Sequence, residues 1–196
     1  HTMERVYESL GETKERKKKS VYYRGKLAKL VSRVVYTGIA TPLLLLWTHL
    51  VMGVRVKGRE NLRGLRGGAL TVCNHVHTLD SAVVGLAFFP RKIVFTTLPQ
   101  NMDSLWPGAL VRLLGSVAVP QKVMDIKMFF DEIEILLLRG CIVHFFPEGE
   151  LRPYDTRLRD FKRGAFYLAA HARVPLIPLS ITFRRPAGLY RFFRRK

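Results

Sequence analysis

An alternation of short β-prone runs with helix-like segments constrains the fold of this chain more than any other feature of its sequence. The β-prone runs are residues 54–57, 69–73, 92–97, 116–119, 141–146 and 176–183. Helical spacing covers residues 80–89, 106–114, 123–138 and 164–173, and a Gly-rich turn covers residues 61–68. Strands that alternate with helices build parallel sheets with helices on their faces. We therefore predict an α/β fold with a mostly parallel sheet flanked by helices.

A basic and then apolar segment precedes this alternation. Residues 3–30 are rich in Lys and Arg, and residues 34–54 contain no Asp, Glu, Lys or Arg. That apolar length is enough to span a bilayer. Thr41-Pro42 near its centre favours two shorter helices instead, with Thr41 as the cap of the second and Pro42 in its first turn.

The two helices are expected at residues 25–40 and 42–53. An apolar helix pair beside a basic arm is typical of a motif that lies in one leaflet of an anionic membrane. The alternative is a pair of buried packing helices. We expect residues 1–54 to form the basic arm and the membrane-associated two-helix motif, and residues 55–196 to form the α/β domain.

Composition limits the partners of the chain. It carries 33 Lys and Arg against 15 Asp and Glu, a formal net charge of +18 at pH 7. Such an excess favours a polyanionic partner: nucleic acid, anionic lipid headgroups or a phosphorylated substrate. Cys73 and Cys141 fall inside predicted strands without metal-type spacing, and we expect them to be free thiols in a reducing cytosol. His1-Thr2 reads as a cloning remnant, and we expect no cleavable signal peptide.

Titratable side chains stand directly after the predicted strand at residues 69–73. Asn74-His75 ends the apolar run, and Asp80 follows five residues after the histidine. The loop and first helical turn can bring the Asp80 carboxylate onto one nitrogen of the His75 ring, which leaves the other nitrogen to act as a base near neutral pH. Backbone N–H groups at the start of the following helix are expected to stabilise a developing oxyanion.

The predicted strand at residues 141–146 ends in a constrained acidic turn. Glu148 stands between Pro147 and Gly149, where we expect it to orient a hydroxyl substrate or to brace the loop. Carboxyl ends of parallel strands gather at one edge of an open α/β sheet, where ligands bind. The two strand ends together are a stronger signal than either motif alone. They predict a site in which His75 takes a proton from an attacking hydroxyl.

Four short blocks follow one another along the chain. They are Asn74-His75 with Asp80, then residues 115–119, then Phe146-Pro147-Glu148-Gly149, and finally residues 174–178. In their order and spacing these blocks resemble those of the glycerolipid acyltransferase family, which includes the lysophosphatidic acid acyltransferases. The resemblance extends over about residues 30–183. The basic arm and apolar helix pair are also similar to the family's membrane-binding motif.

The resemblance implies transfer of a fatty acyl group from a thioester to a glycerolipid hydroxyl. The implied donor is acyl-CoA or acyl-carrier protein as a co-substrate, with no bound cofactor and no metal. The implied acceptor is a lysophospholipid, foremost 1-acyl-glycerol-3-phosphate, which gives phosphatidic acid. His75 and Asp80 match the family's catalytic pair, with Asn74 in the same block, and Glu148 and Gly149 match the block associated with acceptor binding. The implied location is the cytoplasmic face of the cell membrane.

The chain departs from the family pattern at two places. Gln121 stands where phosphate-binding members commonly carry an arginine, and residues 150–152 replace the usual Thr-Arg after the third block. Arg152, Lys162 or Arg163 can supply the contact to an acceptor phosphate through charge-assisted hydrogen bonds. The alternative is an acceptor other than lysophosphatidic acid.

Two interpretations from other classes stay open. His75, His77, Asp80 and His144 are candidate ligands of a metal-dependent hydrolase, although no Asp-His pair follows at the spacing typical of such enzymes. His144 taken alone reads as a hydrogen-bonded histidine that lines the sheet. The net charge also fits a non-enzymatic binder of anionic lipid or nucleic acid. No nucleic-acid-binding motif occurs, and such a binder leaves His75, Asp80 and Glu148 without a role.

Overall fold

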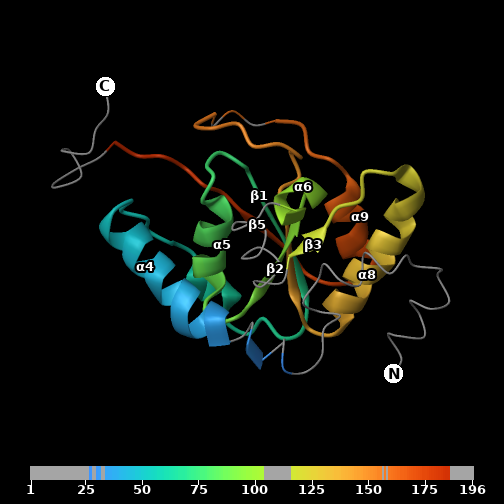
Figure 1. Cartoon of the computed structure of the whole chain (residues 1–196), viewed down its shortest axis with the longest axis horizontal. Coiled ribbons are helices and arrows are strands. Elements are labelled where there is room, and N and C mark those ends of the chain that lie inside the picture. The colour runs from blue at the N-terminus through green and yellow to red at the C-terminus, as the bar shows by residue number, and fades with distance from the viewer. Residues whose placement is uncertain are drawn as a thin grey trace.

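A five-stranded sheet, in which all neighbouring strands are parallel, forms the centre of the described chain (Figure 1). The structure is a computed structural model, and it describes residues 27, 30–31, 34–103, 116–155, 157 and 159–185. The strands are β1 (Ala69–Cys73), β2 (Ile93–Thr97), β3 (Val117–Ala118), β4 (Ile142–Phe145) and β5 (Leu176–Leu179). Their order in the sheet is β3-β2-β4-β1-β5. The predicted α/β architecture with a parallel sheet is confirmed.

Helices cover both faces of the sheet. They are α4 (Thr41–Leu50), α5 (Asp80–Phe88), α6 (Pro99–Asp103), α8 (Ile126–Leu138) and α9 (Gly164–His171), with short helical turns at Val35–Ala40, Arg59–Leu62 and Val123–Asp125. Figure 1 shows α8 and α9 on one side of the sheet and α5 on the other, with α4 outside α5. Helix α5 contacts both β2 and α4, so it lies between the sheet and the N-terminal apolar segment.

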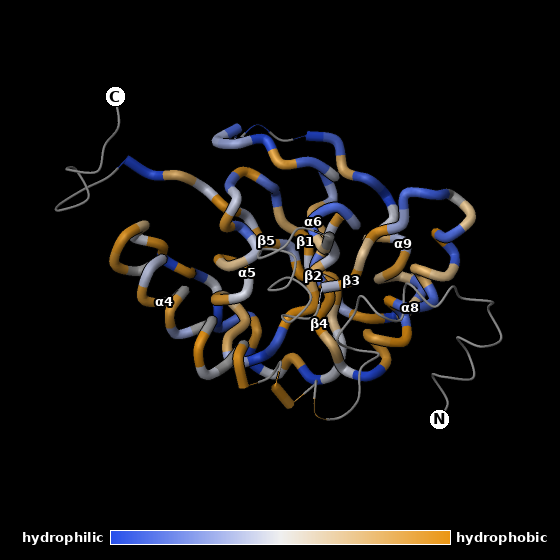
Figure 2. The backbone as a smooth tube through the Cα atoms, in the orientation of Figure 1, coloured by the Kyte–Doolittle hydropathy of each residue, from blue (hydrophilic) through white to orange (hydrophobic). Residues whose placement is uncertain are grey.

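The side chains of β1 alternate between two apolar cores. Leu70 and Val72 belong to the core under α8 and α9. Ala69 and Cys73 belong to the core under α5. Because both faces are covered, all five residues of β1 are buried, which explains why its sequence is apolar instead of alternating. Figure 2 shows hydrophilic loops along the upper edge of the sheet, above this apolar interior.

The pairing of β1 with β4 sets the geometry of that upper edge. Thr71 lies opposite His144, and Val72 lies opposite Phe145. The same register, continued three residues past the pair at Val72, brings His75 level with Glu148. The two strand ends that carry the predicted site are therefore direct neighbours.

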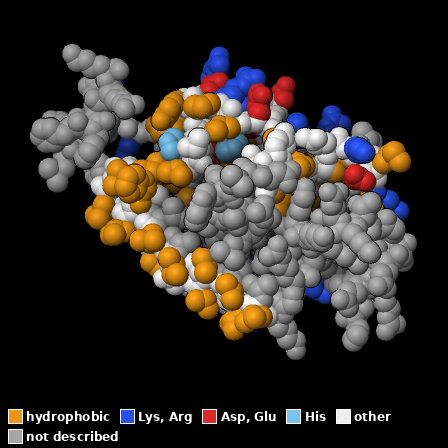
Figure 3. Space-filling view, in the orientation of Figure 1, with side chains coloured by type: hydrophobic (Ala, Val, Ile, Leu, Met, Phe, Trp, Pro, Cys, Tyr) orange, Lys and Arg blue, Asp and Glu red, His pale blue; other side chains and the backbone are white. Residues whose placement is uncertain are grey.

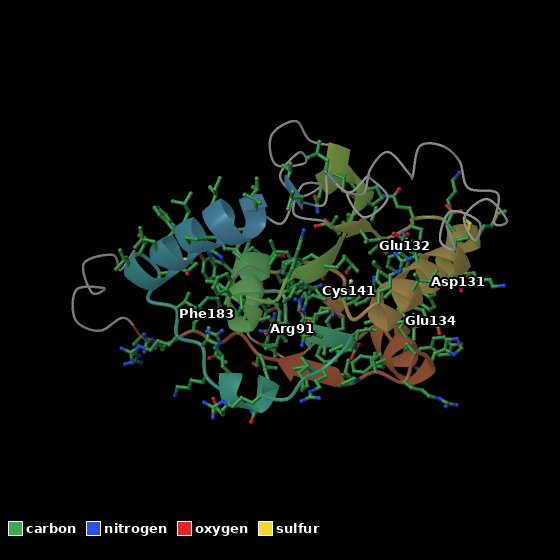
Figure 4. The ribbon with its side chains drawn as sticks, turned by 90° about the horizontal axis from the view of Figure 1, so that it is seen from below. Arg91, Asp131, Glu132, Glu134, Cys141 and Phe183 are labelled. Carbon is green, nitrogen blue, oxygen red and sulfur yellow. The ribbon has the colours of Figure 1, made fainter. Side chains whose placement is uncertain are left out.

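At the opposite edge, the segment before β1 passes close to the end of α8. A Cβ atom on Gly68 would lie 2.0 Å from the carbonyl oxygen of Leu137. Arg91, which follows α5 and is labelled in Figure 4, donates hydrogen bonds to the carbonyl oxygens of Leu65 (2.9 Å) and Gly67 (2.6 Å). These contacts fix the point at which the chain enters the sheet.

Several boundaries differ from the predictions, although the remaining elements lie close to their predicted bounds. Residues 54–57 are not a strand, because no described strand lies beside them to complete a hydrogen-bond ladder. The last strand ends at Leu179, and the side chain of Asn74 binds the backbone of Ile181 beyond it. Helix α6 was not predicted. The helix predicted at residues 106–114 lies outside the described residues.

The apolar N-terminal segment is described only in part. Pro42 lies in the first turn of α4, as predicted, but Thr41 is the first residue of the helix and not a cap before it, and the helix ends at Leu50 and not at residue 53. The first predicted helix of this segment includes residues outside the described part, and its described end is a π-helical turn at Val35–Ala40. None of the described helices combines the length and the apolar character that crossing a membrane requires. The domain boundary after residue 54 stays a prediction.

The close approach at Gly68 predicts a large effect of a small substitution. Gly68→Ala should lower the free energy of unfolding by about 1–3 kcal/mol, because the added methyl group overlaps the backbone of α8. Urea denaturation followed by circular dichroism measures the change. Gly38→Ala is the matched control, since a Cβ atom at that exposed helical position meets nothing within 4 Å. Equal losses of stability in the two variants would contradict the prediction.

Candidate active site

Two polar turns meet at the carboxyl edge of the sheet, as the sequence predicts. Asn74-His75 follows β1, and Pro147-Glu148 lies beyond the end of β4, its parallel neighbour. The backbone N–H of His75 donates a hydrogen bond to Glu148 Oε2 at 3.0 Å. The two strand ends therefore form one site.

The His75–Asp80 pair has the geometry of an oriented base. Nδ1 of His75 lies 2.9 Å from Oδ2 of Asp80, whose side chain is 1% exposed against 21% for His75. The same Oδ2 atom accepts hydrogen bonds from the backbone N–H groups of Val76 (2.6 Å) and His77 (2.8 Å). These contacts fix the carboxylate, and the carboxylate fixes the ring. Nε2 is then the ring nitrogen that is left to take a proton.

Hydrogen bonds within the loop occupy the backbone N–H groups that precede α5. The N–H groups of Val76 and His77 donate to Asp80, that of Leu79 donates to Nδ1 of His77 (3.1 Å), and that of Asp80 donates to the His77 carbonyl oxygen (3.0 Å). These four donors are bound within the loop and are not available to an oxyanion. The expectation that N–H groups of the first turn of α5 stabilise an oxyanion stays a prediction for Ser81 and Ala82.

Phe146 supports one face of the His75 ring. The two ring centroids lie 3.8 Å apart with 13° between the ring planes, a stacked arrangement. His144 meets the Phe146 ring edge-on, with centroids 4.6 Å apart. Stacking fixes the plane of the imidazole, and the face of the aromatic ring attracts the protonated form of the base. From the sequence, Phe146 was identified only as a member of the third block, and its stacking on His75 was not predicted.

Glu148 holds the loop that carries the base. Its side chain is 1% exposed, and its Oε2 atom both accepts the His75 N–H and forms an ion pair with Arg159. Gly149 closes the turn with a φ of 78°, and its N–H donates to the Phe146 carbonyl oxygen at 3.0 Å. Of the two roles predicted for Glu148, these contacts favour bracing the loop.

Arg159 is a site residue that was not predicted. Its side chain is 12% exposed, and it reaches Glu148 from 11 positions further along the chain. It stands in an irregular segment before α9, so no strand or helix period pointed to it. In a chain with 33 Lys and Arg, a single arginine on a loop carries no signal of its own.

Asn74 and Arg152, both predicted to bind substrate, have contacts within the protein. The Asn74 amide donates to the Ile181 carbonyl oxygen (2.9 Å) and accepts from the Ile181 N–H (2.8 Å), so it joins β1 to the segment after β5. The Arg152 side chain is 54% exposed and pairs with Glu150, while its backbone N–H donates to the His75 carbonyl oxygen at 3.1 Å. Asn74 therefore has a structural role, and Arg152 remains at the rim of the site.

Lys162 and Arg163 lie beside the same turn, just before α9. The backbone N–H of Lys162 donates to the Pro147 carbonyl oxygen at 2.8 Å, and its Nζ atom lies 2.5 Å from where a Cβ on Gly149 would be. Arg163 directly precedes α9, and both side chains are exposed. Gln121 is also exposed, beyond β3, where its amide donates to Gln100 Oε1 at 3.2 Å.

The four candidate metal ligands do not converge on one point. His144 is fully buried in β4, where its Nδ1 atom lies 2.6 Å from Thr71 Oγ1. His75 is bound to Asp80 through Nδ1, and His77 accepts a backbone hydrogen bond. Within the described residues, no group of three or more His, Cys, Asp or Glu side chains could hold a metal ion.

Burial changes the pKa of two groups on the α5 side of the sheet. Burial, with a smaller effect of nearby His75, lowers the pKa of His144 from 6.5 to about 3, so this histidine is neutral. Burial, reinforced by the Asp80 carboxylate, raises the pKa of the Cys73 thiol to about 12. Cys73 is therefore a poor nucleophile, which argues against a thiol-bound acyl intermediate at this site. Cys73 is a free thiol, as predicted.

The neutral His144 predicts a loss of stability in mild acid. The unfolded chain binds a proton at this histidine near pH 6.5, whereas the folded chain does so only near pH 3. The contribution of His144 to stability is therefore complete above pH 6.5 and falls as the pH is lowered through this window. His144→Gln should reduce the fall in the free energy of unfolding between about pH 7 and about pH 4.5.

His171→Gln is the matched control, because the His171 side chain is 57% exposed on α9. Its pH dependence should follow that of the unmodified protein in the same denaturation experiment. An unchanged pH dependence in His144→Gln would overturn the prediction.

Comparison with known proteins agrees with the geometry of the site. A model of the Acyltransferase family matches residues 53–182. The chain is 32% identical over 136 residues to a chloroplastic 1-acyl-sn-glycerol-3-phosphate acyltransferase of Arabidopsis thaliana, covering 65% of this chain and 35% of that protein. It is 31% identical over 148 residues to the 1-acyl-sn-glycerol-3-phosphate acyltransferase alpha of Mus musculus, covering 70% and 48%.

The human 1-acyl-sn-glycerol-3-phosphate acyltransferase alpha is 26% identical over 156 residues, covering 66% of this chain and 54% of that protein. The chain thus spans about a third to about half of the length of these relatives. No solved structure gives a significant match. The family model covers well over half of the chain and includes both strand ends of the site, and the chain belongs to the Acyltransferase family.

Proposed function

We propose that this protein is a membrane-associated O-acyltransferase that transfers a fatty acyl group to the free hydroxyl of a lysophospholipid. The observation that carries the proposal is the His75–Asp80 pair, 2.9 Å apart at the carboxyl edge of the sheet, in a chain of the Acyltransferase family. The curated relatives are named for the acceptor 1-acyl-sn-glycerol-3-phosphate, which supports the same acceptor here and phosphatidic acid as the product.

The reaction follows from the orientation of the His75 ring. Nε2 removes the proton of the acceptor hydroxyl as its oxygen attacks the carbonyl carbon of the thioester. Asp80, bound at Nδ1, and the stacked Phe146 ring stabilise the imidazolium that forms. When the tetrahedral intermediate collapses, the C–S bond breaks and the departing sulfur takes the proton from Nε2. An ester and a free thiol result, the base is restored, and no acyl-enzyme is needed.

The exposed basic residues around the acidic turn at Glu148 contact the acceptor phosphate in this proposal. Lys162 lies directly against Gly149, while Arg152 and Arg163 are exposed near the same turn. Gln121, in the place of the usual arginine, has an amide that carries no charge, and it bonds to Gln100. Among the three predicted phosphate contacts, the position of Lys162 favours it most.

The donor and the location complete the proposal. The thioester comes from acyl-CoA or acyl-carrier protein as a co-substrate, and no bound cofactor is required by the chemistry above. The free thiol of Cys73 fits a reducing compartment, which supports the cytoplasmic face of the cell membrane. The net charge of +18 favours an anionic lipid surface there.

The exposed side of α4 supplies an apolar surface for such a membrane. Leu43, Leu46, Trp47, Leu50 and Val51 line an open hollow of about 430 Å³ on this helix. Each of these side chains is at least 38% exposed. Figure 3 shows the apolar band that they belong to, with pale blue histidine side chains at its upper end. Burial of this band in one leaflet removes apolar surface from water, and the basic residues 3–30 precede it in the sequence.

Removal of the proposed base tests the reaction. His75→Ala should lower the rate of acyl transfer from a labelled acyl donor to 1-acyl-glycerol-3-phosphate by about 10²–10⁴-fold, the usual contribution of a general base. Asp80→Asn should lower the rate less, since the ring stays in place but loses its carboxylate partner. Circular dichroism and thermal melting establish that both variants fold. Transfer at the unmodified rate by folded His75→Ala would refute the proposal.

Charges placed on α4 test the membrane contact. Leu43→Glu/Leu46→Glu should weaken binding to vesicles of anionic phospholipid by about tenfold or more, because each buried leucine contributes about 1.5–3 kcal/mol. Leu138→Glu is the matched control, because Leu138 is a 69% exposed leucine at the end of α8. Sedimentation of vesicles measures the bound fraction. Equal binding by the α4 variant and the control would contradict a membrane-facing α4.

A further inference from the structure

Arg159 is a buried cation whose contacts converge on the backbone of the base. Its side chain is 12% exposed, and a charge this far from water must be paired to be tolerated. Its Nη2 atom forms the ion pair with Glu148 Oε2 and donates to the carbonyl oxygens of His75 (3.1 Å) and Glu150 (3.2 Å). One guanidinium nitrogen therefore joins both strand ends of the site.

The contacts of Glu148 and Arg159 hold the backbone of His75 on both sides of its Cα atom. The His75 N–H donates to Glu148 Oε2 at 3.0 Å, and the His75 carbonyl oxygen accepts from Arg159. The oxygen that accepts the His75 N–H is the same one that pairs with Arg159. The side chain of His75 is fixed separately, by Asp80 and Phe146. The His75 carbonyl oxygen also accepts the Arg152 N–H, so loss of Arg159 would remove one of two hydrogen bonds to this oxygen and would leave Glu148 Oε2 without its cation.

We propose that Glu148 and Arg159 are a positioning pair, which sets the place of the His75 backbone and does not bind the acceptor. This inference rests on the proposed function, in which His75 is the base. It departs from the role in acceptor binding that the sequence resemblance implies for Glu148. The 1% exposure of the Glu148 side chain leaves no room for a hydroxyl substrate on its carboxylate.

The charges around Arg159 also argue against a phosphate site at this residue. Its Nη1 atom lies 3.7 Å from Glu150 Oε1, and Nη2 is paired with Glu148, so two carboxylates face one cation. A phosphate would have to displace the Glu148 carboxylate from Nη2 to bind this residue. Nε and Nη1 have no hydrogen-bond partner within the described residues, but both are buried. The guanidinium therefore binds groups of the protein itself and not an anionic ligand.

A displaced base slows the chemical step and leaves substrate binding unchanged. Arg159→Met keeps the apolar stem of the side chain but removes its donors. It should lower kcat by about 10–100-fold, because small misplacements of a catalytic group have effects of this size, and it should leave the KM for 1-acyl-glycerol-3-phosphate within about twofold. Arg159→Lys should restore most of kcat, since all three contacts come from Nη2 and one ammonium can replace that nitrogen.

The experiment measures kcat and the acceptor KM of the full chain by acyl transfer, together with thermal melting of each variant. Arg157→Ala is the matched control on the same loop, because Arg157 is 83% exposed and pairs with Asp155 away from His75. It should change neither constant. Should Arg159→Met fail to fold with Glu148 unpaired, the double variant Glu148→Gln/Arg159→Met removes both charges and should show the same loss of kcat.

Two results would overturn the inference. One is a raised acceptor KM with kcat unchanged, which would make Arg159 a binding residue. The other is an unchanged kcat in folded Arg159→Met. Acyl transfer by His75→Ala distinguishes failure of the positioning pair from failure of the proposed function. If folded His75→Ala transfers acyl groups at the unmodified rate, the proposed function fails; if it is inactive while Arg159→Met is fully active, only the positioning pair fails.

Discussion

The parallel pairing of β1 with β4 decides which groups can meet at the carboxyl edge of the sheet. Val72 lies opposite Phe145, and this register places the chain after β1 beside the chain after β4. The His75 N–H then reaches Glu148 at 3.0 Å, and the His75 ring stacks on Phe146. A shift of one residue in this pairing would turn every side chain of one strand to the other face and break both contacts. The proposed base therefore depends on this register, which the contact between Thr71 Oγ1 and His144 Nδ1 (2.6 Å) favours across the same strand pair.

Two buried carboxylates hold different parts of His75, the proposed base. Asp80 binds the ring and the two N–H groups that follow it, at Val76 and His77. Glu148 binds the N–H of His75 itself and is neutralised by Arg159. Buried carboxylates without such donors would be costly, and here each is satisfied by groups of the loop that it orders. The same arrangement explains why the N–H groups of Val76 and His77 cannot stabilise an oxyanion: they already donate to Asp80.

The parts of the site that are local in sequence could be predicted, and the parts that depend on the path of a loop could not. His75, Asp80 and Glu148 follow apolar runs at short, readable distances, so their place at strand ends was recognisable. Arg159 meets His75 across 84 positions of sequence, through a segment without periodic pattern. The prediction of a strand at residues 54–57 was wrong for a related reason. A β-prone run becomes a strand only beside a partner strand, and strand pairing depends on the whole fold. Asn74 was chemically conspicuous, yet both sides of its amide bind the backbone at Ile181.

Helix α5 connects the catalytic edge to the apolar N-terminal helix. Its first residue is Asp80, which orients the base, and its outer side contacts α4. In the proposed function, α4 rests in the lipid that supplies the acceptor, so one helix links the membrane contact to the carboxylate of the active site. Because α5 is packed against the sheet through Val84 and Phe88, it cannot move with α4 without disturbing that core. The proposed base is thereby held by the sheet core through α5, and the contact of α5 with α4 links it to the surface from which, in the proposed function, a lysophospholipid hydroxyl arrives.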